Sequence, residues 1–295
     1  MGSTRIRLDL AYDGTGFSGW ARQQGLRTVQ GVLEGRLTDL FASTGAAPTV
    51  TVAGRTDVGV HAIGQVAHVD VGEAELAVLD RGRGQGSTRG AVSLARRLNG
   101  IAGPVSDLVV LRSAEAAEGF DARFAALWRR YEYRIADAAA LRDPRRRDHT
   151  LWHPATLELA AMEDAASSLL GLHDFAAYCR PREGATTIRS LQEFSWRRDD
   201  VGVLVATVRA DAFCHSMVRA LVGACIAAGE GRLARGRAVE LRDTGARSSD
   251  FTVVPARGLT LVEVGYPPDA ELASRVERTR ARREAAEVAR SPVIE

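Results

Sequence analysis

Apolar and polar residues alternate near the N-terminus and then take up a helical spacing. Residues 5–12 alternate as a strand does, and Asp13-Gly14-Thr15-Gly16 ends the run with turn formers. From Thr28, a common helix cap, apolar side chains recur every three or four positions as far as Phe41, and Gly45 supplies a stop. Two more strands are expected near residues 48–53 and 63–71.

The same pattern, read to the end of the chain, predicts two similar halves. The first half continues with an arginine- and glycine-rich insert at 81–86, a helix over 87–99 that ends at Gly100, and a strand near 105–112. The second half predicts strands over 124–136, 188–197, 201–210 and 259–266, and helices over 154–170 and 213–228. Each half follows the order β-α-β-β-α-β, which is typical of a ferredoxin-like domain. We therefore expect an α+β protein with two ferredoxin-like domains, 1–112 and 113–270, whose antiparallel sheets flank a central cleft, and a charged, frayed tail over 271–295.

Composition narrows the class of protein. Of the 295 residues, 45% are hydrophobic, which is enough for a sizeable core, and no apolar run is long enough to span a bilayer. The charged and alternating N-terminus does not resemble a signal peptide. Three cysteines (Cys179, Cys214 and Cys225) are too few and too scattered for a disulfide framework or a metal site, so a reducing cytoplasm is the expected location.

All 39 basic residues are arginine, because the chain contains no lysine. This excludes a P-loop lysine, a lysine Schiff base and a kinase-type catalytic lysine. A GC-rich genome is one explanation of the bias. Arginine is also the better residue for bidentate contact with phosphate and for stacking on bases.

The first candidate for chemistry is Asp57, within Ala53-Gly54-Arg55-Thr56-Asp57-Val58-Gly59-Val60-His61. Its carboxylate stands between two glycines, two residues after Arg55, in a loop that joins two expected strands. An aspartate in such a loop is usually a turn former. The glycines also let a ligand approach the backbone, so both roles stay open.

A second candidate is Arg219, because the segment around it, residues 213–226, is apolar on nearly every side. Such a helix is expected to be buried. A buried arginine must meet a carboxylate, face a substrate phosphate, or extend its charge to the surface. Asp57 is a candidate partner from the other half.

Arginines and aromatics share the expected strand over 124–136. A period of two places Tyr131, Tyr133 and Ile135 on one face and Arg130, Glu132 and Arg134 on the other. A strand tyrosine can be a platform on which a base stacks, or simply part of the core. Four following arginines suggest either an RNA-facing surface or a solvated loop: Arg142, Arg145, Arg146 and Arg147.

The histidines do not form a convincing metal site. His61, His68 and Asp70 are close in sequence, but His68 and Asp70 are expected on the solvated face of an alternating strand. We therefore predict no metal.

Taken together, the ordered motifs resemble the TruA-type tRNA pseudouridine synthases over about residues 5–267. They are Tyr12-Asp13-Gly14-Thr15-Gly16-Phe17-Ser18-Gly19-Trp20, Thr28-Val29-Gln30, the Asp57 loop through Ala62, Gly64-Gln65-Val66-Ala67-His68, Phe120-Asp121-Ala122-Arg123-Phe124, Arg130-Tyr131-Glu132-Tyr133, Gly171-Leu172-His173-Asp174-Phe175, Met217-Val218-Arg219 and Pro255-Ala256-Arg257-Gly258-Leu259-Thr260-Leu261.

The resemblance implies an activity and a set of site residues. Asp57 would be the catalytic nucleophile, Tyr131 would pack on the target base, and Arg219 would pair with the aspartate. Arg55 would lie beside the flipped nucleotide, and Leu259 would line the pocket. It further implies a homodimer that converts uridines 38 to 40 of the tRNA anticodon arm and needs no cofactor.

Two other classes of function remain as alternatives. One is an RNA-binding module without catalysis, or a synthase that also assists tRNA folding. The other is a metal-dependent hydrolase built on Asp57, His61 and His68, for which the ligand spacing is poor.

Overall fold

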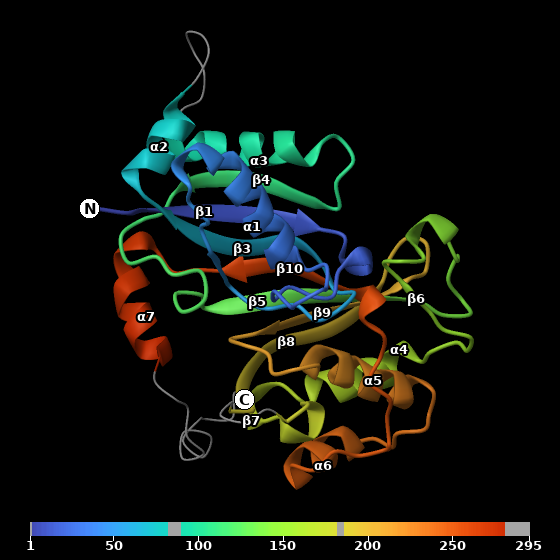
Figure 1. Ribbon diagram of the computed structural model, residues 1–295. Coiled ribbons are helices and arrows are strands. Elements are labelled where there is room, and N and C mark those ends of the chain that lie inside the picture. Colours follow the sequence, from blue (N-terminus) through green and yellow to red (C-terminus); the bar gives the residue numbers. More distant parts are fainter. Residues whose placement is uncertain (1, 82–89, 182–185, 281–295) are drawn as a thin grey trace. The chain divides into compact units, whose positions relative to one another are not determined.

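The computed structural model describes residues 2–81, 90–181 and 186–280. These residues form two compact units: the chain up to Leu127 together with Glu263–Arg280, and Trp128–Val262. Both units combine helices with mostly antiparallel strands, so the predicted α+β class is confirmed (Figure 1). Within the described ranges, no helix is long and apolar enough to cross a membrane.

The first unit is a small antiparallel sheet with helices. Its elements are β1 (Thr4–Tyr12), α1 (Val29–Leu40), β2 (Val50–Val52), β3 (His61–Val71), α2 (Glu73–Asp80), α3 (Leu94–Ala102), β4 (Leu108–Glu115) and α7 (Leu272–Arg280). β1 lies between β3 and β4, and β2 pairs with β3. Six apolar side chains of β1 and α1 are fully buried, as their spacing predicted, whereas Val32 and Leu40 are only partly buried: the six are Ile6, Leu8, Leu10, Val29, Leu33 and Leu37. The Thr28 hydroxyl caps α1 by accepting a hydrogen bond from Gly31 N at 3.2 Å.

The second unit is built on the strand order β5-β9-β8-β7. Its elements are β5 (Trp128–Ala136), β6 (Leu151–Trp152), α4 (Leu159–Ser167), β7 (Gly171–Asp174), β8 (Ile188–Arg198), β9 (Leu204–Ala210), α5 (Met217–Gly229), α6 (Arg237–Thr244) and the start of β10 (Leu259–Gly265). Every residue of α5 except Arg219 is buried. The helix lies so close to α4 that a Cβ on Gly229 would be 2.8 Å from Met162 Cγ.

Several boundaries differ from the sequence-based expectation. α3 continues through Gly100 and ends before Gly103, whose φ of +76° only glycine adopts freely. The strand expected from residue 124 begins at Trp128, and the pattern did not predict α2, α6, β6 or β7. Of the expected 81–86 insert, only Arg81 lies within the described residues.

The C-terminal segment and the cysteines add detail that the pattern lacked. In the expected tail, α7 buries Leu272, and Arg275 Nη2 donates to Ala126 O at 3.1 Å. Residues 281–295 lie outside the described part of the chain. The cysteines form no framework among the described residues, but the sequence analysis did not foresee the one disulfide, which joins Cys179 and Cys214 with their Cα atoms 5.7 Å apart.

Candidate active site

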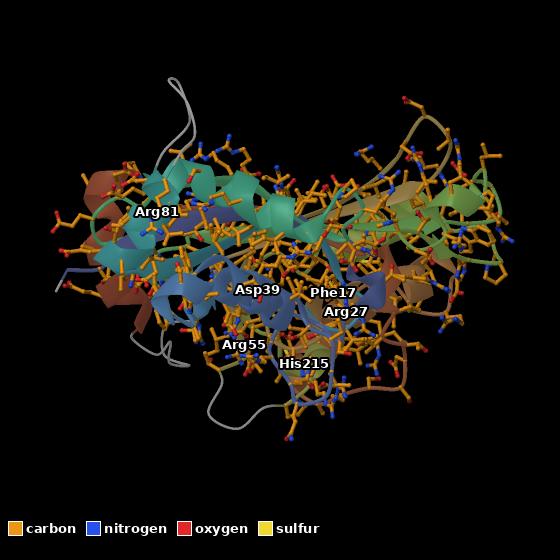
Figure 2. The ribbon with its side chains drawn as sticks, turned by 45° about the horizontal axis from the view of Figure 1, so that its top comes forward. Phe17, Arg27, Asp39, Arg55, Arg81 and His215 are labelled. Atoms are coloured by element: carbon orange, nitrogen blue, oxygen red, sulfur yellow. A yellow bond between two sulfur atoms is a disulfide. The ribbon has the colours of Figure 1, made fainter. Side chains whose placement is uncertain are left out.

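Asp57 lies in a tight turn between β2 and β3 of the first unit. Val60 N donates to Asp57 O at 3.2 Å, and Gly59 has a φ of +76°. A glycine with positive φ at the third position of a turn is the requirement of a type II geometry. The Asp57 side chain is half-buried, while Arg55 (labelled in Figure 2) and Val58 are exposed. The turn therefore holds the carboxylate at the surface of its unit.

The segment after β1 supports this turn from one side. Trp20 N donates to Thr56 O at 3.0 Å, and Gly59 N donates to Phe17 O at 3.4 Å. Gly19 has a φ of +86°, and a Cβ there would lie 3.0 Å from Thr56 O. The glycines of the Tyr12–Trp20 motif are thus explained by close approach to the backbone of the Asp57 turn.

Two histidines of β3 accept hydrogen bonds from the main chain, and His68 differs from the expectation. His61 Nδ1 accepts from Gly14 N at 3.0 Å, and His68 Nδ1 accepts from Ala122 N at 3.0 Å. Because His61 Nδ1 accepts from Gly14 N, it cannot also donate to Asp13 Oδ1, which lies 3.1 Å away. The expectation of a solvated His68 is wrong: the side chain is buried, and burial followed by repulsion from Arg5 lowers its pKa. In both histidines the Nδ1 lone pair is thus used by a main-chain donor.

A buried polar group behind the turn was missed by the sequence analysis. Tyr12, Thr56 and Gln65 have 4%, 6% and 0% of their surface exposed. The Tyr12 hydroxyl lies 2.8 Å from Thr56 Oγ1, and Gln65 Nε2 donates to Tyr12 Oη at 3.1 Å and to Gly54 O at 2.9 Å. Burial raises the pKa of Tyr12 to about 12, although its two hydrogen bonds act in the opposite direction. Tyr12 is therefore neutral at physiological pH.

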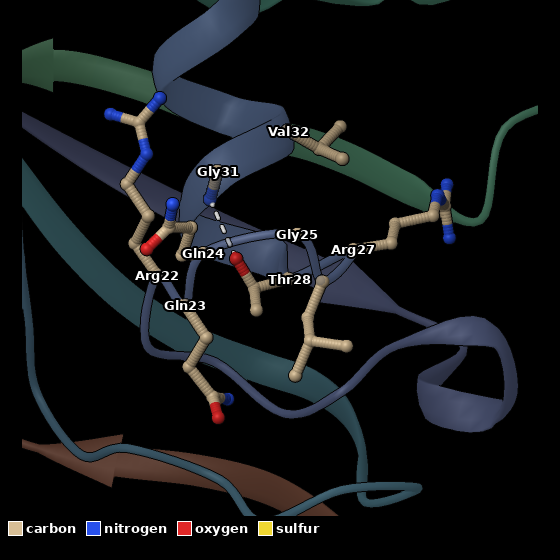
Figure 3. A pocket seen from close by; sticks show the side chains of 9 residues that line it. Arg22, Gln23, Gln24, Gly25, Arg27, Thr28, Gly31 and Val32 are labelled. Carbon is tan, nitrogen blue, oxygen red and sulfur yellow. Dashed lines mark hydrogen bonds between the residues drawn. The ribbon is translucent and has the colours of Figure 1, made fainter.

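A hollow in front of α1 lies in the same unit (Figure 3). Its lining is Arg22, Gln23, Gln24, Gly25, Leu26, Arg27, Thr28, Gly31 and Val32. Arg27 donates to both oxygens of Asp107, at 2.7 and 2.8 Å, and its Cζ lies 4.1 Å from the centre of the Phe17 ring. Arg22 pairs with Glu34 at 3.3 Å. Both arginines are thus engaged within the protein.

Tyr131 belongs to the second unit and lies on β5. Its side chain points to the buried face together with Tyr133 and Ile135, as the period of two predicted. The Tyr131 ring meets the Phe213 ring edge-on, with centres 5.1 Å apart and planes at 88°. Of the two tyrosines, Tyr131 keeps 7% of its surface exposed, whereas Tyr133 is fully buried.

Arg219 lies in the first turns of α5, which fix its backbone. Arg219 Nε donates to Val254 O at 2.6 Å, and Val254 N donates to Arg219 O at 3.3 Å. The helix is held against this segment at Gly223, where a Cβ would lie 2.0 Å from Thr252 O. Arg219 Nε is thus held by a main-chain carbonyl, and the pairing of the guanidinium with Asp57 stays a prediction.

Leu259 opens β10 in the second unit and is 5% exposed. The preceding Gly258 packs on the Tyr133 ring, because a Cβ there would lie 2.8 Å from Tyr133 Cε1. Tyr133 also donates to Pro255 O at 2.8 Å. The first unit thus carries Asp57 and Arg55 in one loop, and the second carries Tyr131 within β5, Arg219 in the first turn of α5 and Leu259 at the start of β10.

The arginines that follow β5 have acidic or aromatic neighbours in the second unit. Arg145 pairs with Asp143 at 2.8 Å, and Arg147 lies 3.4 Å from Asp148, with both arginine side chains largely exposed. Arg142 lies over the exposed Trp152, 5.9 Å from its ring centre. A solvated loop and an RNA contact both fit these pairs.

Comparison with known proteins agrees with the motifs. A family model described as tRNA pseudouridine synthase matches residues 10–82 and 165–267. A protein of Leifsonia xyli subsp. xyli named tRNA pseudouridine synthase A is 62% identical over 279 residues, which cover 94% of this chain and 97% of the relative. Proteins of the same name from Streptomyces griseus and Mycobacterium leprae are 51% and 47% identical, and the aligned residues cover 95% and 94% of this chain and 94% of each relative. The chain therefore belongs to the tRNA pseudouridine synthases, a family of isomerases.

Proposed function

We propose that the protein converts uridine to pseudouridine at positions 38, 39 and 40 of the tRNA anticodon stem-loop, with Asp57 as the nucleophile. The observation that carries the proposal is the Asp57 turn: a half-exposed carboxylate on a backbone that is hydrogen-bonded from two sides. The family model spans this turn, and the named relatives support tRNA as the substrate.

The reaction rearranges one nucleotide without an external reactant. The bond between ring nitrogen 1 and ribose carbon 1′ breaks, and a bond between ring carbon 5 and carbon 1′ forms. Carbon 5 gives up a proton, and nitrogen 1 takes one up, so product and substrate are isomers. A carboxylate that adds to ring carbon 6 or to carbon 1′ can hold the fragment during the rotation, which divides one difficult step into easier ones.

We assign the remaining site residues by the same logic. Arg219 pairs with the Asp57 carboxylate and orients it through a charge-assisted hydrogen bond. Tyr131 packs on the target base and is the candidate for proton transfer at carbon 5, while Leu259 lines the pocket. Arg55 lies beside the flipped nucleotide, which must leave its stack at a cost of a few kcal/mol.

The proposal also covers assembly and location. The protein acts as a homodimer in the cytoplasm, and the reaction needs neither metal nor organic cofactor, because no electron or group enters or leaves the nucleotide. Sedimentation of the purified protein across a concentration series tests the dimer.

Tritium release from tRNA labelled at uridine carbon 5 tests the chemistry. We expect Asp57→Asn to lose on the order of 10³-fold or more of turnover, with tRNA affinity within about threefold of the wild type. Asp39→Asn on α1, an exposed aspartate that the proposal leaves without a role, is the matched control. Release that persists in Asp57→Asn would refute the nucleophile. No release by the wild type from any tRNA, with binding retained, would leave an RNA-binding module as the function.

A further inference from the structure

We propose that Tyr12, Thr56 and Gln65 are positioning residues that hold the Asp57 carboxylate in its attacking position. The inference rests on the proposed function and concerns how the first unit prepares the nucleophile. None of the three side chains needs to touch the substrate. They act through the backbone of the turn that carries Asp57.

The network begins at Gln65, which lies on β3 and is fully buried. Its side-chain amide donates to Gly54 O at 2.9 Å, at the start of the turn, and to Tyr12 Oη at 3.1 Å. Its carbonyl oxygen accepts from Val66 N at 3.2 Å. The amide orientation is therefore fixed by a donor at one end and two acceptors at the other.

Thr56 directly precedes Asp57 and connects it to the network. Its hydroxyl lies 2.8 Å from the Tyr12 hydroxyl, and its carbonyl accepts from Trp20 N at 3.0 Å. Both the side chain and the main chain of Thr56 are thus tied to β1 and the segment that follows it. Gly19 packs against the same stretch of backbone. A Cβ on Gly19 would lie 3.0 Å from Thr56 O and 3.3 Å from Asp57 C.

Asp57 therefore follows a residue with little freedom. Gly54, two residues before Thr56, is anchored through Gln65, and Val60 N closes the turn on Asp57 O at 3.2 Å. Nucleophilic attack depends on a near-attack geometry, and an error of about 1 Å can cost on the order of 100-fold in rate. A rigid main chain on both sides of the nucleophile meets this requirement.

Stability alone does not account for three buried polar side chains at this position. Apolar residues of the same shape would fill the space without a desolvation cost. The polar groups instead connect two strands and the turn, because Tyr12 and Thr56 are 44 residues apart and Tyr12 and Gln65 are 53 apart. Buried networks in which the partners are satisfied make a local structure unique and rigid.

The test compares two shape-conserving deletions with a matched control. Tyr12→Phe and Thr56→Val remove the hydroxyls but keep the volume, and Thr56→Ser restores the hydroxyl. Tyr178→Phe is the control, because Tyr178 is fully buried and donates one hydrogen bond of 2.8 Å to Ala238 O, far along the chain from the Asp57 turn. Each protein is measured for tRNA affinity, single-turnover pseudouridine formation and thermal unfolding.

We expect Tyr12→Phe and Thr56→Val to lower the single-turnover rate about 10- to 100-fold, with the tRNA dissociation constant within about threefold. Thr56→Ser recovers most of the rate, and Tyr178→Phe keeps it within about twofold although its unfolding temperature also falls. The double variant Tyr12→Phe/Thr56→Val loses little more than either single variant, since the two hydroxyls act on each other.

Equal rates in Tyr12→Phe, Thr56→Val and Tyr178→Phe would overturn the inference, and so would a rate loss that only follows the loss of stability. Failure of the proposed function is distinct, because the wild type would then form no pseudouridine. If the wild type is active, Asp57→Asn is inactive, and Tyr12→Phe and Thr56→Val are fully active, the proposed function stands and the positioning role is refuted.

Discussion

A single methyl group on Gly14 would displace the turn that carries Asp57. The Cβ of Gly14→Ala would stand 2.1 Å from Val60 O and 2.4 Å from Val60 C. Real Cβ atoms essentially never approach closer than 3.0 Å, so Val60 must retreat by about 0.9 Å. Val60 N closes the turn on Asp57 O, and therefore the movement reaches Asp57 directly.

The size of the effect follows from this displacement. Overpacking of this kind costs about 1–3 kcal/mol of stability. A misplacement near 1 Å costs on the order of 100-fold in rate, or about 2.7 kcal/mol of transition-state stabilisation. We thus expect a folded Gly14→Ala protein with about 1% of the wild-type turnover.

Gly16→Ala is the matched control, two residues along in the same turn. Its Cβ would meet only the ends of two side chains, Arg27 Nη1 at 3.4 Å and Asp107 Oδ2 at 3.6 Å. Urea unfolding and tritium release from labelled tRNA are measured for both variants. Equal turnover in Gly14→Ala and Gly16→Ala would refute the argument that close backbone packing positions Asp57.

Three further predictions concern the titration and pairing of buried groups. Burial raises the pKa of Tyr12 to about 12, whereas a tyrosine in the unfolded chain ionises at about 10. The stability that the neutral Tyr12 contributes is therefore complete below about pH 10 and is lost as the pH rises towards 12. The free energy of unfolding of Tyr12→Phe should fall less steeply over this range than that of the wild type, and parallel curves would contradict the assignment. Burial raises the pKa of the Cys225 thiol to about 12, so iodoacetamide at pH 8 should label Cys225 only after unfolding, as peptide mass spectrometry would show. The fully buried Asp137 accepts from Arg198 at 2.7 and 3.0 Å, and Asp137→Asn should cost about 2–4 kcal/mol in urea unfolding, against less than about 0.5 kcal/mol for the exposed Glu240→Gln; equal costs would show that burial of the pair is immaterial.

Much of the fold could be predicted because burial on one face imposes a period on the sequence. Alternation located β1 and the buried tyrosines of β5, and helical spacing located α1. In α5 the informative signal was an exception to the pattern: Arg219 is the one residue of the helix that is not buried. Patterns of this kind involve residues close together in the chain, so they can be recognised from the sequence alone.

The predictions that were wrong depend on contacts between residues far apart in the chain. Gly100 and Gly103 are both plausible helix ends in the sequence, but only Gly103 takes a positive φ, because the path of the chain after the helix decides which one turns. His68 occupies a polar position of β3 and was expected in solvent. Residues 120–122 cover that face, and Ala122 N donates to the ring, from 54 positions further along the chain.

Some residues of the candidate site can be identified from a sequence motif, and others only from the structure. Asp57 has the chemistry of a nucleophile and neighbours that a motif records, so the sequence could name it. Tyr12 and Gln65 belong to the motifs of the resemblance, but the sequence assigned them no role, and their contacts appear only when β1 and β3 bring them to Thr56 and Gly54. If the positioning role is correct, a polypeptide with the complete Asp57 motif but apolar residues at positions 12 and 65 should bind tRNA and turn it over slowly. Reactivity in this protein would then depend on the residues behind the turn as well as on the carboxylate that the turn presents.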